Sequence, residues 1–253
     1  MNNMQKKTNL MKKLAIGSWC QIGHPANAEI LAHAGFSWIA ADCEHGEFGN
    51  HQLGNFCRSV QQYNCKPLVR VESNDIIEIR RALDLGAEGV IVPLVNNAAE
   101  AQNAVSAAKY PPKGIRGFAF HRGNQWGVNF DEYLRSANDE ILVIVMIESK
   151  EAVENIDKIL AVEGVDGVFI GPYDMSGSYG IIGQTAHSLI TEACKKVAKS
   201  CKKHNKIAGQ HIVLPTKGNI ENAIDQGYTF LALGMDTVFL ANGAKQSLEM
   251  IND

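Results

Sequence analysis

Short apolar runs alternate with amphipathic stretches along the chain, and this alternation is the main structural signal in the sequence. We predict eight strands, at residues 14–19, 36–42, 66–71, 89–95, 141–148, 165–172, 206–212 and 228–236. Stretches with helical spacing lie between them, and several begin near Pro, Asp or Asn and end before Gly, as helix caps require. The pattern is typical of βα units around a parallel sheet.

Eight such units in 253 residues predict an α/β fold, a (β/α)8 TIM barrel formed by residues 1–253 as a single domain. A doubly wound sheet is the alternative, but it would need fewer strands, and no glycine-rich fingerprint follows the first strand. Residues 111–140 interrupt the alternation before the fifth strand. We expect this segment to be a lid, an oligomer contact or both, with a plain surface insertion as the alternative.

Composition narrows the class of protein. A net charge of -3 gives no basic footprint for nucleic acid or a membrane surface. The longest apolar run, at residues 141–147, is too short to span a membrane, and the basic N-terminal stretch is not followed by a signal-peptide core. The six cysteines form no CxxC pair, which favours reduced thiols over disulfides or zinc. We therefore expect a soluble cytoplasmic protein.

Polar residues gather where the predicted strands end. The stretch "ADCEHGEF" at residues 41–48 follows an apolar run, and Trp19, Arg70 and Glu148 end other strands. Asp174 follows the sixth strand through "IGPYD". The C-terminal ends of the strands carry the active site in barrels of this kind. These residues, together with Gln210, His211 and Asp236 of the last two strands, are therefore expected at one polar mouth.

Glu148 and Asp174 end neighbouring strands and could share a divalent ion. Two carboxylates without a nearby Cys or His suit Mg²⁺ or Mn²⁺, with Co²⁺ as a further candidate. In the alternative, Glu148 is a helix N-cap or first-turn residue and Asp174 caps a loop. Arg70 offers a planar fork of donors for a carboxylate or an enolate oxygen. Its alternative role is a structural partner of Asp42 or Glu72.

His45 lies beside two carboxylates and is a candidate for proton transfer near neutral pH. Asp42 or Asp84 could orient its ring, and a purely structural histidine is the alternative. The sequence "EHGEF" is not the HExxH motif of zinc proteases.

Several segments, taken in order, resemble one enzyme family. They are "AGFSWIAADCEHG", "PLVRVESND", "ALDLGAEGVIVPLVNNAAEA", "YPPKGIRG", "MIESKEAVENIDKILAVEGVDGVFIGPYDMSGSYG" and "LALGMDT". Over residues 14–240 the chain resembles the HpcH/HpaI family of class II pyruvate aldolases, which includes 4-hydroxy-2-oxoheptanedioate and 2-keto-3-deoxy sugar acid aldolases. The resemblance implies a modified barrel that packs as a homohexamer, with the eighth helix, here residues 237–251, exchanged between subunits.

The resemblance also implies roles for individual residues. Glu148 and Asp174 match the metal ligands, and Arg70 matches the arginine that stabilises the enolate. His45 with Asp84 matches the acid/base pair.

The same resemblance implies further substrate-binding residues. Gly171, Tyr173 and Asp174 match the turn whose backbone holds the carboxylate of the donor. Trp19 is expected to bind substrate, and Arg122 matches a basic residue that faces the acceptor.

The implied reaction is the reversible cleavage of a 4-hydroxy-2-keto acid into pyruvate and an aldehyde through a metal-stabilised pyruvate enolate. No Schiff-base lysine is expected, because Lys66 and Lys206 lie at strand beginnings. Met146 replaces a glutamine and Tyr173 a small residue of well-known members, and both changes should reshape the donor site. The alternatives are a citrate- or malyl-thioester lyase of the related barrel family and a non-catalytic oligomer that binds keto acids.

Overall fold

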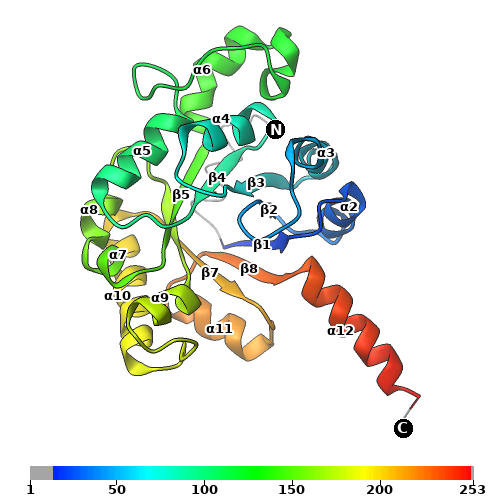
Figure 1. Cartoon of the computed structure of the whole chain (residues 1–253), viewed down its shortest axis with the longest axis vertical. Coiled ribbons are helices and arrows are strands. Elements are labelled where there is room, and N and C mark those ends of the chain that lie inside the picture. The colour runs from blue at the N-terminus through cyan, green and yellow to red at the C-terminus, as the bar shows by residue number, and fades with distance from the viewer. Residues whose placement is uncertain (1–13, 252–253) are drawn as a thin grey trace.

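The computed structural model describes residues 14–251, and within them eight parallel strands close into a barrel in chain order (Figure 1). The strands are β1 (Ala15–Cys20), β2 (Trp38–Asp42), β3 (Lys66–Arg70), β4 (Gly89–Val92), β5 (Leu142–Ile147), β6 (Gly167–Ile170), β7 (Ile207–Ile212) and β8 (Phe230–Met235). Every predicted strand overlaps an observed one. The predicted (β/α)8 barrel is therefore confirmed.

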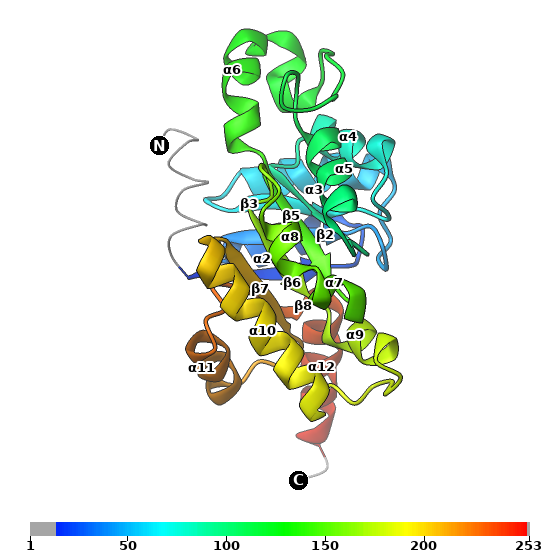
Figure 2. The ribbon, with the colours of Figure 1, turned by 90° about the vertical axis from the view of Figure 1, so that its left-hand side faces the viewer.

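Helices alternate with the strands and cover the outside of the barrel, as the side view shows (Figure 2). Asp75 and Asn97 cap α4 and α5, in agreement with the Asp and Asn residues expected near helix starts, and the structure adds Ser149 and Thr216 as caps of α7 and α11. The helices are α2 (Pro25–His33), α3 (Asn50–Gln61), α4 (Ile76–Asp84), α5 (Ala98–Ala108), the 3-10 helix η1 (Arg122–Gly127), α6 (Phe130–Glu140), α7 (Lys150–Glu154), α8 (Ile156–Leu160), α9 (Pro172–Ser178), α10 (Ser188–His204), α11 (Lys217–Asp225) and α12 (Asp236–Glu249).

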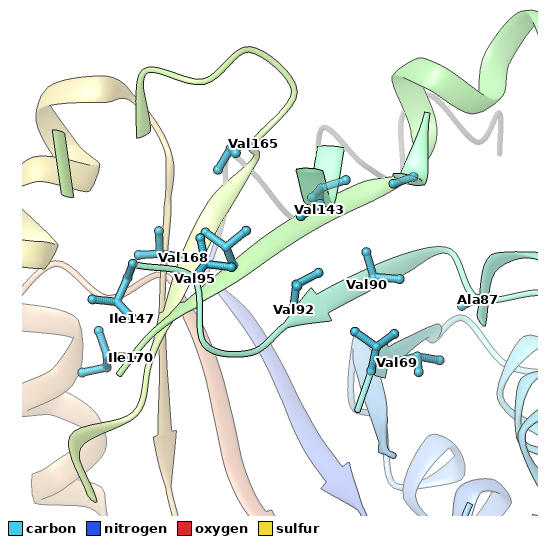
Figure 3. Close-up of a cluster of buried hydrophobic side chains, with 14 of the residues drawn as sticks. Val69, Ala87, Val90, Val92, Val95, Val143, Ile147, Val165, Val168 and Ile170 are labelled. Carbon is cyan, nitrogen blue, oxygen red and sulfur yellow. The ribbon is translucent and has the colours of Figure 1, made fainter. Parts of the chain in front are cut away.

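Alternate residues of each strand build two apolar cores. In β5, Leu142, Ile144 and Met146 point into the barrel, whereas the intervening valines and Ile147 pack under the helices. Figure 3 shows part of this outer core, formed by valines and isoleucines of neighbouring strands. Because both faces of the strands are buried, the sequence shows continuous apolar runs rather than alternation.

The interior core depends on one close approach. Trp38 stacks on Phe230 inside the barrel, with ring centroids 4.1 Å apart. A Cβ atom added at Gly17 would lie 2.1 Å from the Trp38 ring, so only glycine leaves room for this indole.

Residues 111–140 contain regular structure, because η1 and α6 occupy much of the segment. The segment leads from the end of α5 to the start of β5, so it lies at the N-terminal end of the barrel (Figure 1). It therefore does not cover the mouth of its own barrel as a lid. It exposes a set of apolar side chains to solvent: Ile115, Phe118, Phe120, Trp126 and Val128.

The last helix, α12, extends away from the barrel (Figure 1). Asp236, its first residue, is its one buried residue, and Leu240 and Leu248 are 67% and 65% exposed. Its expected exchange with a neighbouring subunit stays a prediction. Within residues 14–251, no helix combines the length and the apolar character needed to cross a membrane.

All six cysteines are free thiols, and four of them are fully buried. Burial raises the pKa of the thiols of Cys57, Cys65 and Cys201 to about 12. The thiols are therefore protonated and weakly nucleophilic at neutral pH.

Candidate active site

The C-terminal mouth of the barrel holds a pocket of about 840 Å³ to which β1, β2, β3, β5, β6, β7 and β8 or the loops after them contribute. Most of the residues singled out in the sequence line this pocket: Trp19, His45, Arg70, Glu148, Gly171, Tyr173 and Asp174. Residues from distant parts of the chain are brought together because the C-terminal ends of parallel strands meet at one end of the barrel.

Glu148 is a buried carboxylate of this mouth that no arginine or lysine contacts directly in residues 14–251. It follows β5 directly and is only 5% exposed. Its Oε2 accepts a hydrogen bond of 3.0 Å from the N–H of Leu94. Burial raises the pKa of Glu148 to about 7, and the negative charges of Glu44 and Asp174 add to this effect. The carboxylate is thus held in a place where a nearby cation would stabilise its charge.

Asp174 approaches the same place from the first turn of α9, and its side chain is exposed. Gly171, just before this helix, lies against Glu148: a Cβ atom added at Gly171 would be 2.8 Å from Oε1 of Glu148. A glycine is needed there because any side chain would displace the carboxylate.

Arg70 is held by two carboxylates. Its Nε and NH2 groups donate to Oδ1 and Oδ2 of Asp42 at 2.9 and 2.7 Å, and its NH1 lies 3.0 Å from Oε2 of Glu44. The bidentate pair with Asp42 raises the pKa of Arg70 despite its burial and lowers the pKa of Asp42. The guanidinium carbon also lies 4.8 Å from the centroid of the Trp19 ring. Arg70 is therefore a fixed, fully charged cation in the pocket.

His45 lies at the rim of the pocket, where its side chain is 62% exposed. Its backbone N–H donates to Oδ1 of Asp42 at 3.1 Å, and its Nε2 lies 3.9 Å from Oε2 of Glu44. Asp42 thus orients the loop that carries His45, while Glu44 is the carboxylate next to the imidazole ring.

The carboxylate oxygens of the mouth fit a hard divalent ion that keeps water and substrate as further ligands. Residues 14–251 contain no group of three or more His, Cys, Asp or Glu side chains placed to hold a metal, so a closed structural site is not formed. Glu148 and Asp174 supply two carboxylates, which is the number that Mg²⁺ commonly takes from a protein. Together with Asp42 and Glu44, they outnumber the one arginine of the pocket, so the mouth carries a surplus of negative charge.

Asp84 and Arg122 lie at the other end of the barrel. Asp84 ends α4 and accepts a hydrogen bond of 2.8 Å from NH2 of the buried Arg116. Arg122 donates to Oε1 of Gln61 at 2.7 Å, and the two predicted residues line a second hollow together with His121. Within one chain, therefore, neither residue meets His45 or the two carboxylates of the mouth.

Some residues of the mouth were not assigned from the sequence. Gln21 donates to Oδ2 of Asp42 at 3.0 Å and thereby helps to fix the partner of Arg70. Glu44 was only part of a polar stretch, and nothing in the sequence tells which of its charges pairs with Arg70. Asp236 has a structural role, because it accepts hydrogen bonds from the backbone N–H groups of Gln21 and Ile22.

The comparisons with known proteins identify the family and the fold. The family model described as HpcH/HpaI aldolase/citrate lyase matches residues 15–243. A 4-hydroxy-2-oxo-heptane-1,7-dioate aldolase of Salmonella paratyphi C is 37% identical over 247 residues, which cover 97% of this chain and 93% of that protein.

Solved structures of the same family have the same fold. An HpcH/HpaI aldolase/citrate lyase family protein from Burkholderia cenocepacia matches with a TM-score of 0.94 and 28% identity, over 100% of both chains. An HpcH/HpaI aldolase from Desulfitobacterium hafniense matches with a TM-score of 0.90 and 31% identity, over 98% of this chain and 96% of that one. The chain therefore belongs to the HpcH/HpaI aldolase/citrate lyase family, and it is an aldolase.

Proposed function

We propose that the enzyme reversibly cleaves 4-hydroxy-2-keto acids into pyruvate and an aldehyde, with a divalent metal ion in the mouth of the barrel. The observation that carries the proposal is the buried Glu148, which lines the same pocket as Asp174 and the fixed guanidinium of Arg70. The relatives named 4-hydroxy-2-oxo-heptane-1,7-dioate aldolase support this class of reaction.

Glu148 and Asp174 hold the ion in this proposal. When bound, the ion supplies Lewis-acid stabilisation of negative charge on the keto oxygen of the substrate. The backbone of the turn from Gly171 through Tyr173 to Asp174 binds the carboxylate of the donor. Mg²⁺, Mn²⁺ and Co²⁺ are the candidate ions, since each accepts carboxylate and water ligands.

Arg70 stabilises the charge that develops during cleavage. A base removes the proton of the C4 hydroxyl group, the bond from C3 to C4 breaks to release the aldehyde, and the electron pair moves to the keto oxygen as an enolate, which takes a proton at C3 to give pyruvate. The guanidinium, held by Asp42, presents a cation that needs no reorganisation at that moment. Trp19 packs against the same guanidinium and forms an apolar wall of the substrate pocket.

His45 is the proposed acid/base group, because its exposed ring at the rim can exchange protons with solvent. Its pairing with Asp84 requires the Asp84 of a second copy, since the two lie at opposite ends of one barrel. We propose such an assembly, a hexamer by resemblance, through the exposed apolar residues of segment 111–140 and through α12. Arg122 would reach an acceptor by the same route.

Deuterium exchange into the methyl group of pyruvate is the test, because it needs no knowledge of the aldehyde. We expect exchange in D₂O with Mg²⁺, Mn²⁺ or Co²⁺, followed by NMR, and no exchange with EDTA. The Glu148→Gln variant is the matched control, and it should lose exchange under every ion. Exchange that persists in EDTA would contradict the metal-dependent proposal.

A further inference from the structure

His211 is a second histidine of the pocket, and the function proposed above gives it no role. It lies near the end of β7, on the side of the strand that faces the barrel interior together with Ile207. Its ring packs edge-on against Trp19, with ring centroids 6.1 Å apart and an interplanar angle of 62°. The imidazole is therefore part of the same wall as the indole.

The protein backbone fixes which nitrogen of His211 carries the proton. Nε2 lies 3.0 Å from the carbonyl oxygen of Gly234, and a carbonyl can only accept, so Nε2–H is the donor. Burial lowers the pKa of His211 to about 4, which keeps the ring neutral near pH 7. Nδ1 is then a lone-pair acceptor.

This Nδ1 remains available to a ligand. No hydrogen bond within residues 14–251 involves Nδ1 of His211. Nδ1 is also absent from the set of fully buried polar atoms that lack a partner. One neighbour that lines the pocket and contacts the His211 ring has a sealed, unpaired group: Nε1 of Trp19, a donor. The wall formed by His211 and Trp19 thus keeps unused hydrogen-bonding capacity, which is uncommon for buried polar groups.

The chemistry of Nδ1 decides which group it can bind. A substrate carboxylate placed against His211 would meet the lone pair of Nδ1, and two acceptors form no hydrogen bond. A hydroxyl group, by contrast, can donate to Nδ1.

We propose that His211 is a specificity-determining residue that binds a hydroxyl group of the acceptor aldehyde through Nδ1. This inference rests on the proposed aldolase function and names its acceptor class as short aldehydes with a hydroxyl group close to the carbonyl carbon. The acceptor of the named relatives' substrate differs in this respect. Cleavage of a 4-hydroxy-2-oxo-heptane-1,7-dioate between C3 and C4 gives an aldehyde with a distal carboxylate and no hydroxyl group.

Two acceptors that differ by one hydroxyl group test the proposal. We would measure kcat/KM for the addition of pyruvate to glycolaldehyde and to acetaldehyde, with wild-type protein and three variants. His211→Gln keeps a donor near the position of Nε2, His211→Asn keeps an acceptor near the position of Nδ1, and His211→Leu keeps neither. Circular dichroism would confirm that each variant is folded.

The expected result is a change in selectivity. The ratio of kcat/KM for glycolaldehyde over acetaldehyde should fall about tenfold in His211→Gln and His211→Leu, the worth of one hydrogen bond. His211→Asn should recover much of the ratio, and the loss should appear mainly in KM for glycolaldehyde. An equal ratio in wild type, His211→Gln and His211→Leu would overturn the proposal and leave His211 as a packing partner of Trp19.

A second measurement keeps the two proposals separate. ¹⁵N NMR of histidine-labelled protein should show Nε2 protonated and Nδ1 unprotonated for His211, assigned by its loss in His211→Gln, and the opposite tautomer would overturn the inference. If wild type exchanges deuterium into pyruvate but shows no preference for glycolaldehyde, only the inference on His211 fails. If wild type neither exchanges deuterium nor adds pyruvate to any acceptor, the proposed function fails as well.

Discussion

The two ends of the barrel both carry buried charged residues, but they balance these charges differently. At the N-terminal end, each buried charge has a close partner. Nζ of Lys66 lies 2.5 Å from Oε2 of Glu88, and NH2 of Arg116 lies 2.8 Å from Oδ1 of Asp84. Lys109 donates to two backbone carbonyls, those of Asn138 and Ile141, at 2.7 Å each. This end is held together by matched pairs.

At the C-terminal mouth, the charges do not balance. The carboxylates of Asp42, Glu44, Glu148 and Asp174 outnumber the two cations, Arg70 and the exposed Lys195, and the buried Glu148 has a pKa raised to about 7. A folded chain gains nothing in stability from such a surplus, because a buried charge without a counter-ion is costly. The difference indicates that the mouth is selected for a ligand and the opposite end for stability, and variants at the two ends should separate these properties.

The largest effect is expected at the metal ligands. Glu148→Gln and Asp174→Asn should each lower kcat by at least about 10³-fold, because each removes a charge that holds the ion. Without added metal, Glu148→Gln should unfold at the same or a higher urea concentration than wild type, since it removes a buried charge. Steady-state kinetics and urea denaturation check both statements. A variant with near-normal turnover would remove the ligand assignment.

Arg70→Lys should lower kcat by about 100-fold, because an ammonium cannot keep the bidentate pair with Asp42 and also point a donor at the substrate. Metal affinity, measured by isothermal titration, should change much less than kcat. Arg135→Lys on α6 is the matched control, since Arg135 donates only to the backbone of Asp131 on the surface. Equal losses in kcat and in metal affinity would instead make Arg70 a support of the metal site.

Lys109→Met should show the opposite behaviour at the N-terminal end. It leaves two carbonyl groups without their charged donor and should lower the free energy of unfolding by about 3 kcal/mol. Lys113→Met is the control, because the Lys113–Asp139 ion pair is solvent-exposed and its loss should leave the free energy of unfolding almost unchanged. Activity per folded molecule should be retained in both variants. A stable Lys109→Met protein with low activity would break the proposed division between the two ends.

The smallest effect is a pH dependence of stability that originates at His211. Its folded-state pKa is lowered to about 4 from an ordinary value of 6.5, so the unfolded chain binds the proton first as the pH falls. Stability is lost from about pH 6.5 down to about pH 4, by about 2 kcal/mol after allowance for partial exposure. Urea denaturation at about pH 7 and about pH 4.5 should show a smaller loss for His211→Leu than for wild type. Parallel losses in the two proteins would contradict this origin.

The barrel could be predicted from the sequence because its strands are buried on both faces. Uninterrupted apolar runs such as residues 141–147 predict strands that are buried on both faces. Gly or Asx residues mark the helix ends between these runs. Residues 111–140 were harder to predict. Their glycines and prolines indicated a loop, but α6 forms from residue 130 onward, where no proline interrupts the chain.

The sequence predicted which residues lie at the ends of the strands, but it did not predict which of them contact one another. Trp19, Arg70 and Glu148 meet because strand order fixes where each strand ends. The partner of Asp84 is Arg116, which precedes η1 and is distant in sequence, and only packing brings the two together. The tautomer of His211 depends on a carbonyl group of β8, which no sequence pattern encodes.

The six free cysteines have a practical consequence. Most of them are sealed beneath the helices or inside the strands, and their raised pKa values leave little thiolate at neutral pH. A thiol reagent can therefore modify these positions only when the chain opens around them. The labelling rate of each of the four buried cysteines therefore measures how often its surroundings open, and mass spectrometry can show which side of the barrel opens first.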